Sequence, residues 1–82
     1  MEFTITTKEL EKIYIKMLMN DRNFIMEVMK ISGASLRYLD DKYKDDLEIV
    51  KTAINSDVRA YEYASERLKN YKEIIALVEN NN

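Results

Sequence analysis

Acidic side chains gather in the middle of the sequence, and carboxylate oxygens are the ligands that calcium prefers in proteins. Five of them fall within nine positions: Asp40, Asp41, Asp45, Asp46 and Glu48. A calcium-binding loop needs oxygen ligands at fixed alternate positions, a glycine midway and a closing glutamate. No glycine stands here, and Lys42 and Lys44 interrupt the cluster. We therefore expect no metal site, and interpret these acids as polar helix ends that the helix dipole favours at an N-terminus.

Two arginines and a tyrosine recur at a spacing that would place them on one face of a helix. Arg59, Tyr63 and Arg67 are four residues apart, and side chains at that spacing are neighbours on an α-helix. Tyrosine and arginine are enriched where protein interfaces carry their binding energy. These residues are therefore a candidate partner-binding ridge. The alternative is that Tyr63 packs half-buried against the next helical hairpin, as Tyr38 would.

Three lysines near the N-terminus follow the same spacing, at Lys8, Lys12 and Lys16. They form a second candidate partner-binding surface, a basic ridge for an anionic partner. Glu9 and Glu11 lie beside them in the sequence and reduce the positive potential. A solvated helix face accounts for the same pattern, and we expect that explanation to hold.

Two residue types that often carry catalysis, histidine and cysteine, are missing from this chain. It has no histidine and no cysteine, which removes the commonest proton shuttle, the thiolate nucleophile and the usual zinc ligands. It contains neither a glycine-rich phosphate loop nor a Gly-x-Ser-x-Gly turn. We predict a protein that is not an enzyme and that uses no cofactor.

The charge balance narrows the classes of partner. Thirteen basic and 15 acidic residues leave a net charge of −2, which is too balanced for binding driven by phosphate neutralisation. We therefore do not expect direct nucleic-acid binding. The first ten residues lack the pattern of a signal peptide, and no apolar run approaches the roughly 20 residues that cross a bilayer. We expect a cytoplasmic protein with no membrane partner, located in the host cytoplasm if the gene is phage-borne.

The strongest pattern in the chain is an internal repeat, whose period of about 25 residues is in the range typical of stacked helical repeats. Residues 45–70 align with residues 20–45 when shifted by one period, and residues 70–78 begin a third copy. A candidate helix N-cap recurs in each copy: Asn20, Asp45 and Asn70. Three residues later stand Asn23, Glu48 and Glu73, and the apolar pairs that follow are Phe24-Ile25, Ile49-Val50 and Ile74-Ile75. We therefore predict a capped amphipathic helix at the start of each copy.

Each copy is predicted to be a helical hairpin. The expected helices are Asp21–Ile31, Leu36–Tyr43, Asp46–Asn55, Val58–Lys69 and Tyr71–Glu79. In the first copy the break falls at Ser32-Gly33, where Gly33 is free to take the left-handed conformation. The second helices carry the apolar stripes Leu36, Leu39, Tyr43 and Tyr61, Ala64, Leu68. Because one hairpin cannot bury its apolar face alone, neighbouring hairpins are expected to stack.

A further helix is expected before the repeat, from Thr7 to Met19. Thr6 and Glu9 fit a capping box, and Ile5 and Leu10 fit a hydrophobic staple. The stripe that we expect to face the core consists of Leu10, Ile13, Tyr14, Met17 and Leu18. We interpret this helix as the second arm of an incomplete preceding copy, lengthened to cap the stack.

These patterns predict an all-α fold, a small stack of helical hairpins with five to six short helices. One domain is expected over residues 1–82. Within it we distinguish an N-terminal capping helix at 1–19, a first copy at 20–44, a second at 45–69 and a partial third at 70–79.

The repeat also resembles a known family. The segments that carry the resemblance are Asn20-Asp21-Arg22-Asn23, Ser32-Gly33 and Tyr63-Ala64-Ser65-Glu66-Arg67-Leu68-Lys69-Asn70. They are similar to the bacterial tandem bihelical repeats catalogued as domain of unknown function 4116, and the similarity extends roughly from Asn20 to Val78. The resemblance implies an all-helical fold. Since no activity or ligand is known for that family, it carries over no functional residue.

Three hypotheses of function follow. The first is a non-enzymatic protein–protein interaction module, whose stacked units present an extended surface. The second is a small phage or mobile-element inhibitor that occludes a host nucleic-acid enzyme, suggested by small size, acidity and the lack of a catalytic group. The third is a homo-oligomeric structural protein or homodimer, because incomplete copies leave apolar edges that self-association would cover.

Overall fold

The computed structural model describes residues 7–18 and 20–80 of the 82-residue chain. Helices dominate these residues, and no strand occurs among them. The prediction of an all-α stack of short helices is confirmed. In chain order the α-helices and the 3-10 helices η1 and η2 are α1 (Thr7–Leu18), α2 (Arg22–Ile31), η1 (Gly33–Tyr38), α3 (Asp41–Lys44), α4 (Leu47–Ser56), η2 (Val58–Tyr63), α5 (Glu66–Lys69) and α6 (Lys72–Asn80).

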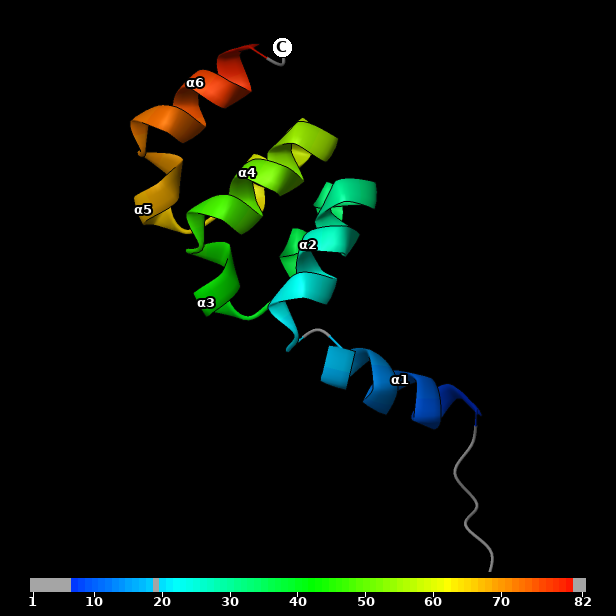
Figure 1. Cartoon of the computed structure of the whole chain (residues 1–82). Helices are drawn as coiled ribbons and strands as arrows, with labels where there is room; N and C mark the ends of the chain where they lie inside the picture. Colours follow the sequence, from blue (N-terminus) through cyan, green and yellow to red (C-terminus); the bar gives the residue numbers. More distant parts are fainter. Residues whose placement is uncertain (1–6, 19, 81–82) are drawn as a thin grey trace, which may run out of the picture.

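The repeat is visible in the succession of these elements. The series α2, η1, α3 begins at positions 22, 33 and 41, and the series α4, η2, α5 begins at 47, 58 and 66, a constant shift of one period. α6 begins at 72, one further period after α4. We call α2–η1–α3 unit one and α4–η2–α5 unit two. The first helices of successive units, α2, α4 and α6, pack side by side (Figure 1).

The second arm of each unit is not one α-helix, so the predicted helices Leu36–Tyr43 and Val58–Lys69 are wrong. A six-residue 3-10 helix ends at an extended residue, Leu39 or Ala64, with ψ of 159° or 158°. One turn of α-helix then follows. In unit two this turn begins at Ser65, whose hydroxyl accepts the amide hydrogen of Leu68 at 3.2 Å. Serine interrupts the arm here because its side chain satisfies an amide group at the start of a new helix.

The predicted N-caps are wrong by one residue. Asp21 and Asp46, rather than Asn20 and Asp45, precede α2 and α4. Their carboxylates accept hydrogen bonds from first-turn amides, at 2.9 Å in α2 and 3.2 Å in α4. α6 begins at Lys72, two residues after Asn70, so Asn70 is not its N-cap either. The two complete units offer consecutive polar residues at this point, and the geometry selects the second of them.

The glutamates expected to complete these caps bind cations of a neighbouring helix instead. Arg22 of α2 donates to Glu48 at 2.8 Å and to Asp46 at 3.1 Å. Lys51 of α4 lies 3.0 Å from Glu73 of α6. These pairs are exposed, so each contributes about 0–1 kcal/mol. They recur at equivalent junctions and thereby favour one register between adjacent first helices.

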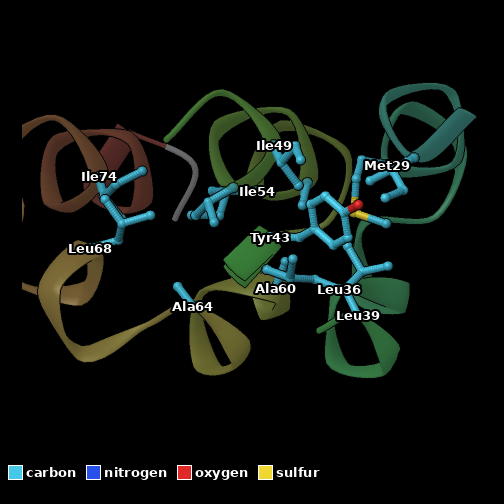
Figure 2. Close-up of a cluster of buried hydrophobic side chains, with 13 residues drawn as sticks. Met29, Leu36, Leu39, Tyr43, Ile49, Ile54, Ala60, Ala64, Leu68 and Ile74 are labelled. Atoms are coloured by element: carbon cyan, nitrogen blue, oxygen red, sulfur yellow. The ribbon is translucent and has the colours of Figure 1, made fainter. Parts of the chain in front are cut away.

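The core lies between the layer of first helices and the layer of second arms. Its side chains come from both layers and meet in one continuous cluster (Figure 2): Ile25, Met29, Leu36, Leu39, Tyr43, Ile49, Val50, Ala53, Ile54, Ala60, Ala64, Leu68 and Ile74. The predicted stripes of the second arms belong to this cluster, except that Tyr61 is only half-buried at its edge. Stacking of the units therefore buries what neither hairpin could bury alone.

The apolar pairs at the start of α2, α4 and α6 make two different contacts. The first members are Phe24, Ile49 and Ile74, and the second members are Ile25, Val50 and Ile75. Phe24 is half-buried, whereas its two counterparts are fully buried. Ile75 is 38% exposed, whereas its two counterparts are fully buried. The first member of a pair is thus fully buried only when another unit comes before its helix. The second member is fully buried only when a second arm follows its helix in the described chain.

The two units place a core-facing tyrosine at different positions of the repeat. Leu36 and Tyr43 of unit one correspond to Tyr61 and Leu68 of unit two. Each phenol hydroxyl donates to a backbone carbonyl, Tyr43 at 3.2 Å and Tyr61 at 2.7 Å. Both partly buried hydroxyls therefore have the partner that burial of a polar group requires.

Gly33 is required for a close approach and not for a left-handed backbone. No described residue has a positive φ, so the predicted left-handed helix end at Gly33 is wrong. A Cβ atom at this position would lie 1.9 Å from the carbonyl oxygen of Ala53 on α4. The Gly33 amide also donates to the hydroxyl of Ser56 at 3.1 Å. The missing side chain thus lets the start of η1 lie directly against α4.

α1 extends away from unit one (Figure 1), and none of its described side chains belongs to the core cluster. Leu10, Ile13 and Met17 are 58%, 52% and 68% exposed, so the prediction that these residues face the core is wrong. Amphipathic spacing identifies the apolar side of a helix but not what covers it. The rest of that prediction lies outside the described residues: Ile5, Thr6, Met19 and the side chains of Tyr14 and Leu18.

We predict that Gly33→Ala lowers the free energy of unfolding by about 1–3 kcal/mol, the usual effect of overpacking. The added methyl group meets the backbone of α4, which cannot move aside as a side chain would. Urea denaturation followed by circular dichroism measures the change. Ile31→Ala is the control, because Ile31 is 84% exposed and its truncation should alter stability by at most about 0.5 kcal/mol. Wild-type stability of Gly33→Ala would contradict the close contact.

Candidate functional site

The structure does not place Arg59, Tyr63 and Arg67 on one helical ridge. Arg59 and Tyr63 lie on η2, and a 3-10 helix aligns residues three apart rather than four. Arg67 lies beyond the break, on α5. Arg59 is paired with Asp57 of its own loop, with Nη2 2.6 Å from Oδ2. Tyr63 is half-buried against the core, which agrees with the half-buried position in the alternative interpretation. Tyr38 is 69% exposed, so the expectation that it packs in the same way is wrong.

Arg67 joins the two units and has its donors engaged within the chain. Its Nε lies 2.9 Å from Asp45 Oδ1, and its Nη2 donates to the Asp45 carbonyl at 2.8 Å. The same carboxylate accepts a hydrogen bond of 2.6 Å from the Ser65 hydroxyl. These hydrogen bonds, from Ser65 first and Arg67 second, hold the pKa of Asp45 below its ordinary value. Arg67 is therefore a residue of the junction between units.

Two further acids of the central cluster, Asp46 and Glu48, also join neighbouring helices. Asp46 and Glu48 both bind Arg22. Across residues 7–18 and 20–80, no three carboxylates lie close enough together to hold a metal ion. A shallow hollow between α2 and α4 is lined by Lys30, Thr52, Asn55 and Ser56. Lys30 is paired with Glu27 there, and the hydroxyl of Thr52 donates to a backbone carbonyl.

The lysines of the second predicted surface lie on α1. Lys8 and Lys12 are exposed, and the side chain of Lys16 lies outside the described residues. An exposed position agrees with a solvated helix face, and the basic ridge stays a prediction. What the sequence did not indicate is that the same helix also exposes Leu10, Ile13 and Met17.

A cluster that the sequence analysis missed lies on the second arms. Arg37 stacks on the ring of Tyr38, with Cζ 4.5 Å from the ring centroid, and its Nη2 donates to the hydroxyl of that tyrosine. The hydroxyls of Tyr38 and, to a smaller extent, Tyr63 raise the pKa of Arg37. The tyrosines come together because η1 and η2 pack side by side. Tyr38 and Tyr63 occupy equivalent positions of the repeat, and this identity could have indicated the cluster from the sequence.

A family model described as a domain of unknown function, DUF4116, matches residues 21–69 and again residues 48–78. The two matches together extend from the N-cap of α2 into α6, which is most of the chain. The chain belongs to the DUF4116 family. No curated protein and no solved structure matches it.

The DUF4116 region contains both units and the Arg37 cluster, and it leaves α1 outside. The description of the family names no activity, so the roles of these surfaces have to be argued from their geometry. None of the helices described for this DUF4116 chain is long and apolar enough to cross a membrane.

Three aspartates of the DUF4116 region have lowered pKa values, and their direction sets the pH dependence of stability. The pKa of Asp45 is lowered by Ser65 and Arg67, and that of Asp57 by Arg59. Partial burial raises the pKa of Asp46, but hydrogen bonds from Arg22 and from the amide of Ile49 outweigh it. A carboxylate with a lower pKa in the folded state stabilises the fold above its unfolded pKa, and this stabilisation is lost as the pH falls.

We therefore predict that the urea midpoint changes little between about pH 7 and 5 and falls below about pH 4, where unfolded aspartates take up protons. Asp45→Asn should be less stable than wild type at neutral pH, and the difference should shrink at pH 3. Asp41→Asn is the control, since Asp41 is exposed and forms no salt bridge among the described residues. An Asp45→Asn difference that is equal at both pH values would contradict the assigned role of this carboxylate.

Proposed function

We propose that this chain is a non-enzymatic protein-interaction module that docks on a partner through the apolar side of α1. The observation that supports the proposal is the exposure of Leu10, Ile13 and Met17, each more than half exposed. They occupy positions i, i+3 and i+7, which are those at which an amphipathic helix anchors itself in an apolar groove. We call these three residues the α1 stripe.

The stability of α1 supports the same conclusion. α1 has 12 residues, and an isolated helix of that length is marginal in water because nucleation is costly. None of its described side chains is buried in the core cluster. Burying a large aliphatic side chain contributes about 1.5–3 kcal/mol. A groove that covers the α1 stripe would therefore stabilise the helix and the complex together.

The polar part of α1 suits the rim of such an interface. Lys8 and Lys12 are exposed on the same helix as the stripe. Charged groups at the edge of an interface accelerate encounter and fix register, whereas apolar anchors supply most of the affinity. We assign the lysines that secondary role, facing a partner with acidic residues around its groove.

Self-association is the second candidate, and a different observation favours it. At the opposite end of the stack, Tyr71 and Ile75 are 37% and 38% exposed, although the positions equivalent to Ile75 are buried in both complete units. A second copy could cover this end with its own α1 stripe. Such a contact joins two different surfaces, so it would build chains or rings rather than a twofold dimer.

The first test uses a photo-crosslinking amino acid at position 13 or at position 12 of the full chain, in the cell that encodes it. We expect a discrete adduct from position 13, within the α1 stripe, and a weaker one from position 12. Mass spectrometry of the adduct separates another protein from a second copy. It also tests the hypothesis that the partner is a host nucleic-acid enzyme. A strictly monomeric protein that forms no adduct at position 13 would overturn the proposal.

The second test compares matched variants against the partner so identified. The triple variant Leu10→Gln, Ile13→Gln, Met17→Gln keeps helix propensity and should weaken binding at least tenfold. The control variant Lys8→Gln, Lys12→Gln changes the rim and should lower affinity by less, with most of the loss in the association rate. A larger loss from the lysine variant than from the stripe variant would favour the basic ridge instead.

A further inference from the structure

Arg37 differs from the other arginines of the DUF4116 region in its partners. Arg22, Arg59 and Arg67 are each held by a carboxylate, at 2.6–3.1 Å. Arg37 stacks on the ring of Tyr38 and donates to its hydroxyl, and the hydroxyl of Tyr63 helps to raise its pKa. It forms no salt bridge within residues 20–80. Its positive charge is therefore not balanced by an acid of the described chain.

The Arg37 guanidinium has hydrogen-bond donors available for an anion. The guanidinium lies over the Tyr38 ring, with Cζ 4.5 Å from its centroid, and an arginine has five N–H donors in a rigid fork. The Tyr38 hydroxyl accepts from Nη2 and occupies only part of that donor set, which leaves donors for a planar acceptor. Carboxylates fit such a fork with two parallel hydrogen bonds. Tyr38 is 69% exposed and adds an aromatic surface beside the charge.

The acid at the equivalent position of the second unit does not pair with Arg37. Glu62 stands one repeat period further along the chain, at the equivalent position of η2, and it is exposed. No salt bridge joins Glu62 to Arg37 within residues 20–80. The neighbouring cation, Arg59, is already paired with Asp57. The surface thus offers one positive charge that no carboxylate within residues 20–80 pairs, beside the aromatic ring of Tyr38.

We propose that Arg37, Tyr38 and Tyr63 form a docking site for an acidic peptide segment of another protein, with one carboxylate bound by the Arg37 fork and an adjacent side chain packed on Tyr38. A nucleic-acid strand fits this surface poorly, because phosphate binding needs several unpaired cations and this surface offers one. The site lies on the second arms and does not include α1, so it does not depend on the function proposed above.

The test is a nuclear magnetic resonance titration of the full ¹⁵N-labelled chain with an end-blocked hexapeptide of alternating glutamate and leucine. We expect saturable shifts of the Arg37 Nε–H and of the amides around Tyr38 and Tyr63. The same peptide with glutamine in place of glutamate should give none. Unsaturable shifts, or equal shifts with the glutamine peptide, would overturn the proposal. Inorganic phosphate at the same concentration is the second arm, and equal saturation by it would show a simple anion site and overturn the assignment to a peptide.

Matched variants distinguish hydrogen bonding by the Arg37 guanidinium fork from an effect of positive charge alone. Arg37→Gln should abolish saturable binding, and Arg37→Lys, which keeps the charge but loses the fork, should weaken it at least threefold. Arg59→Gln removes the same charge from a paired arginine and should change affinity less than twofold. Equal losses from Arg37→Gln and Arg59→Gln would overturn the proposal. The spectra themselves show whether each variant is folded, and the triple variant of the α1 stripe should bind the peptide normally.

Discussion

The close packing of α2, α4 and α6 beside one another is the constraint on which the other features of this fold depend. Each first helix carries an apolar pair, and the two members of the pair serve different neighbours, as the change from Phe24 to Ile49 and from Val50 to Ile75 shows. The helices approach so closely that the start of η1 touches the backbone of α4, where only Gly33 fits. The spacing of the first helices therefore also sets the spacing of the second arms and of the residues that the second arms bring together.

Much of this arrangement could be predicted from the sequence. A recurring polar residue followed by apolar pairs identified the helices, the period of the repeat and most of the core, because burial of an amphipathic face imposes that period. The sequence could not decide between Asn20 and Asp21 as the cap, because both residue types accept first-turn amides. It also could not show the break at Ser65, since Tyr61, Ala64 and Leu68 fit the core equally well from a continuous helix or an interrupted one.

The candidate surfaces were harder to predict than the fold, for a physical reason. Spacing along a helix shows which residues share a face, but the pairing of a charge depends on residues that are distant in sequence. Arg67 is engaged by Asp45, 22 residues earlier, and Arg37 meets Tyr63 across two second arms. The α1 stripe has the pattern of a core-facing helix, and only the position of α1 in space distinguishes an exposed helix from a buried one.

The exchange of tyrosine and leucine between the two units limits how the repeat can change. One unit combines Leu36 with Tyr43 and the other Tyr61 with Leu68, so each arm carries one large and one smaller side chain in opposite order. Copying a single residue from one unit into the other would give two tyrosines or two leucines in one arm. Two tyrosines in one arm would overpack the interior. Two leucines would leave a cavity and a backbone carbonyl without its tyrosine hydroxyl donor. An arm therefore keeps its packing only when both positions are exchanged together, and a new copy made by duplication would inherit one of these two combinations.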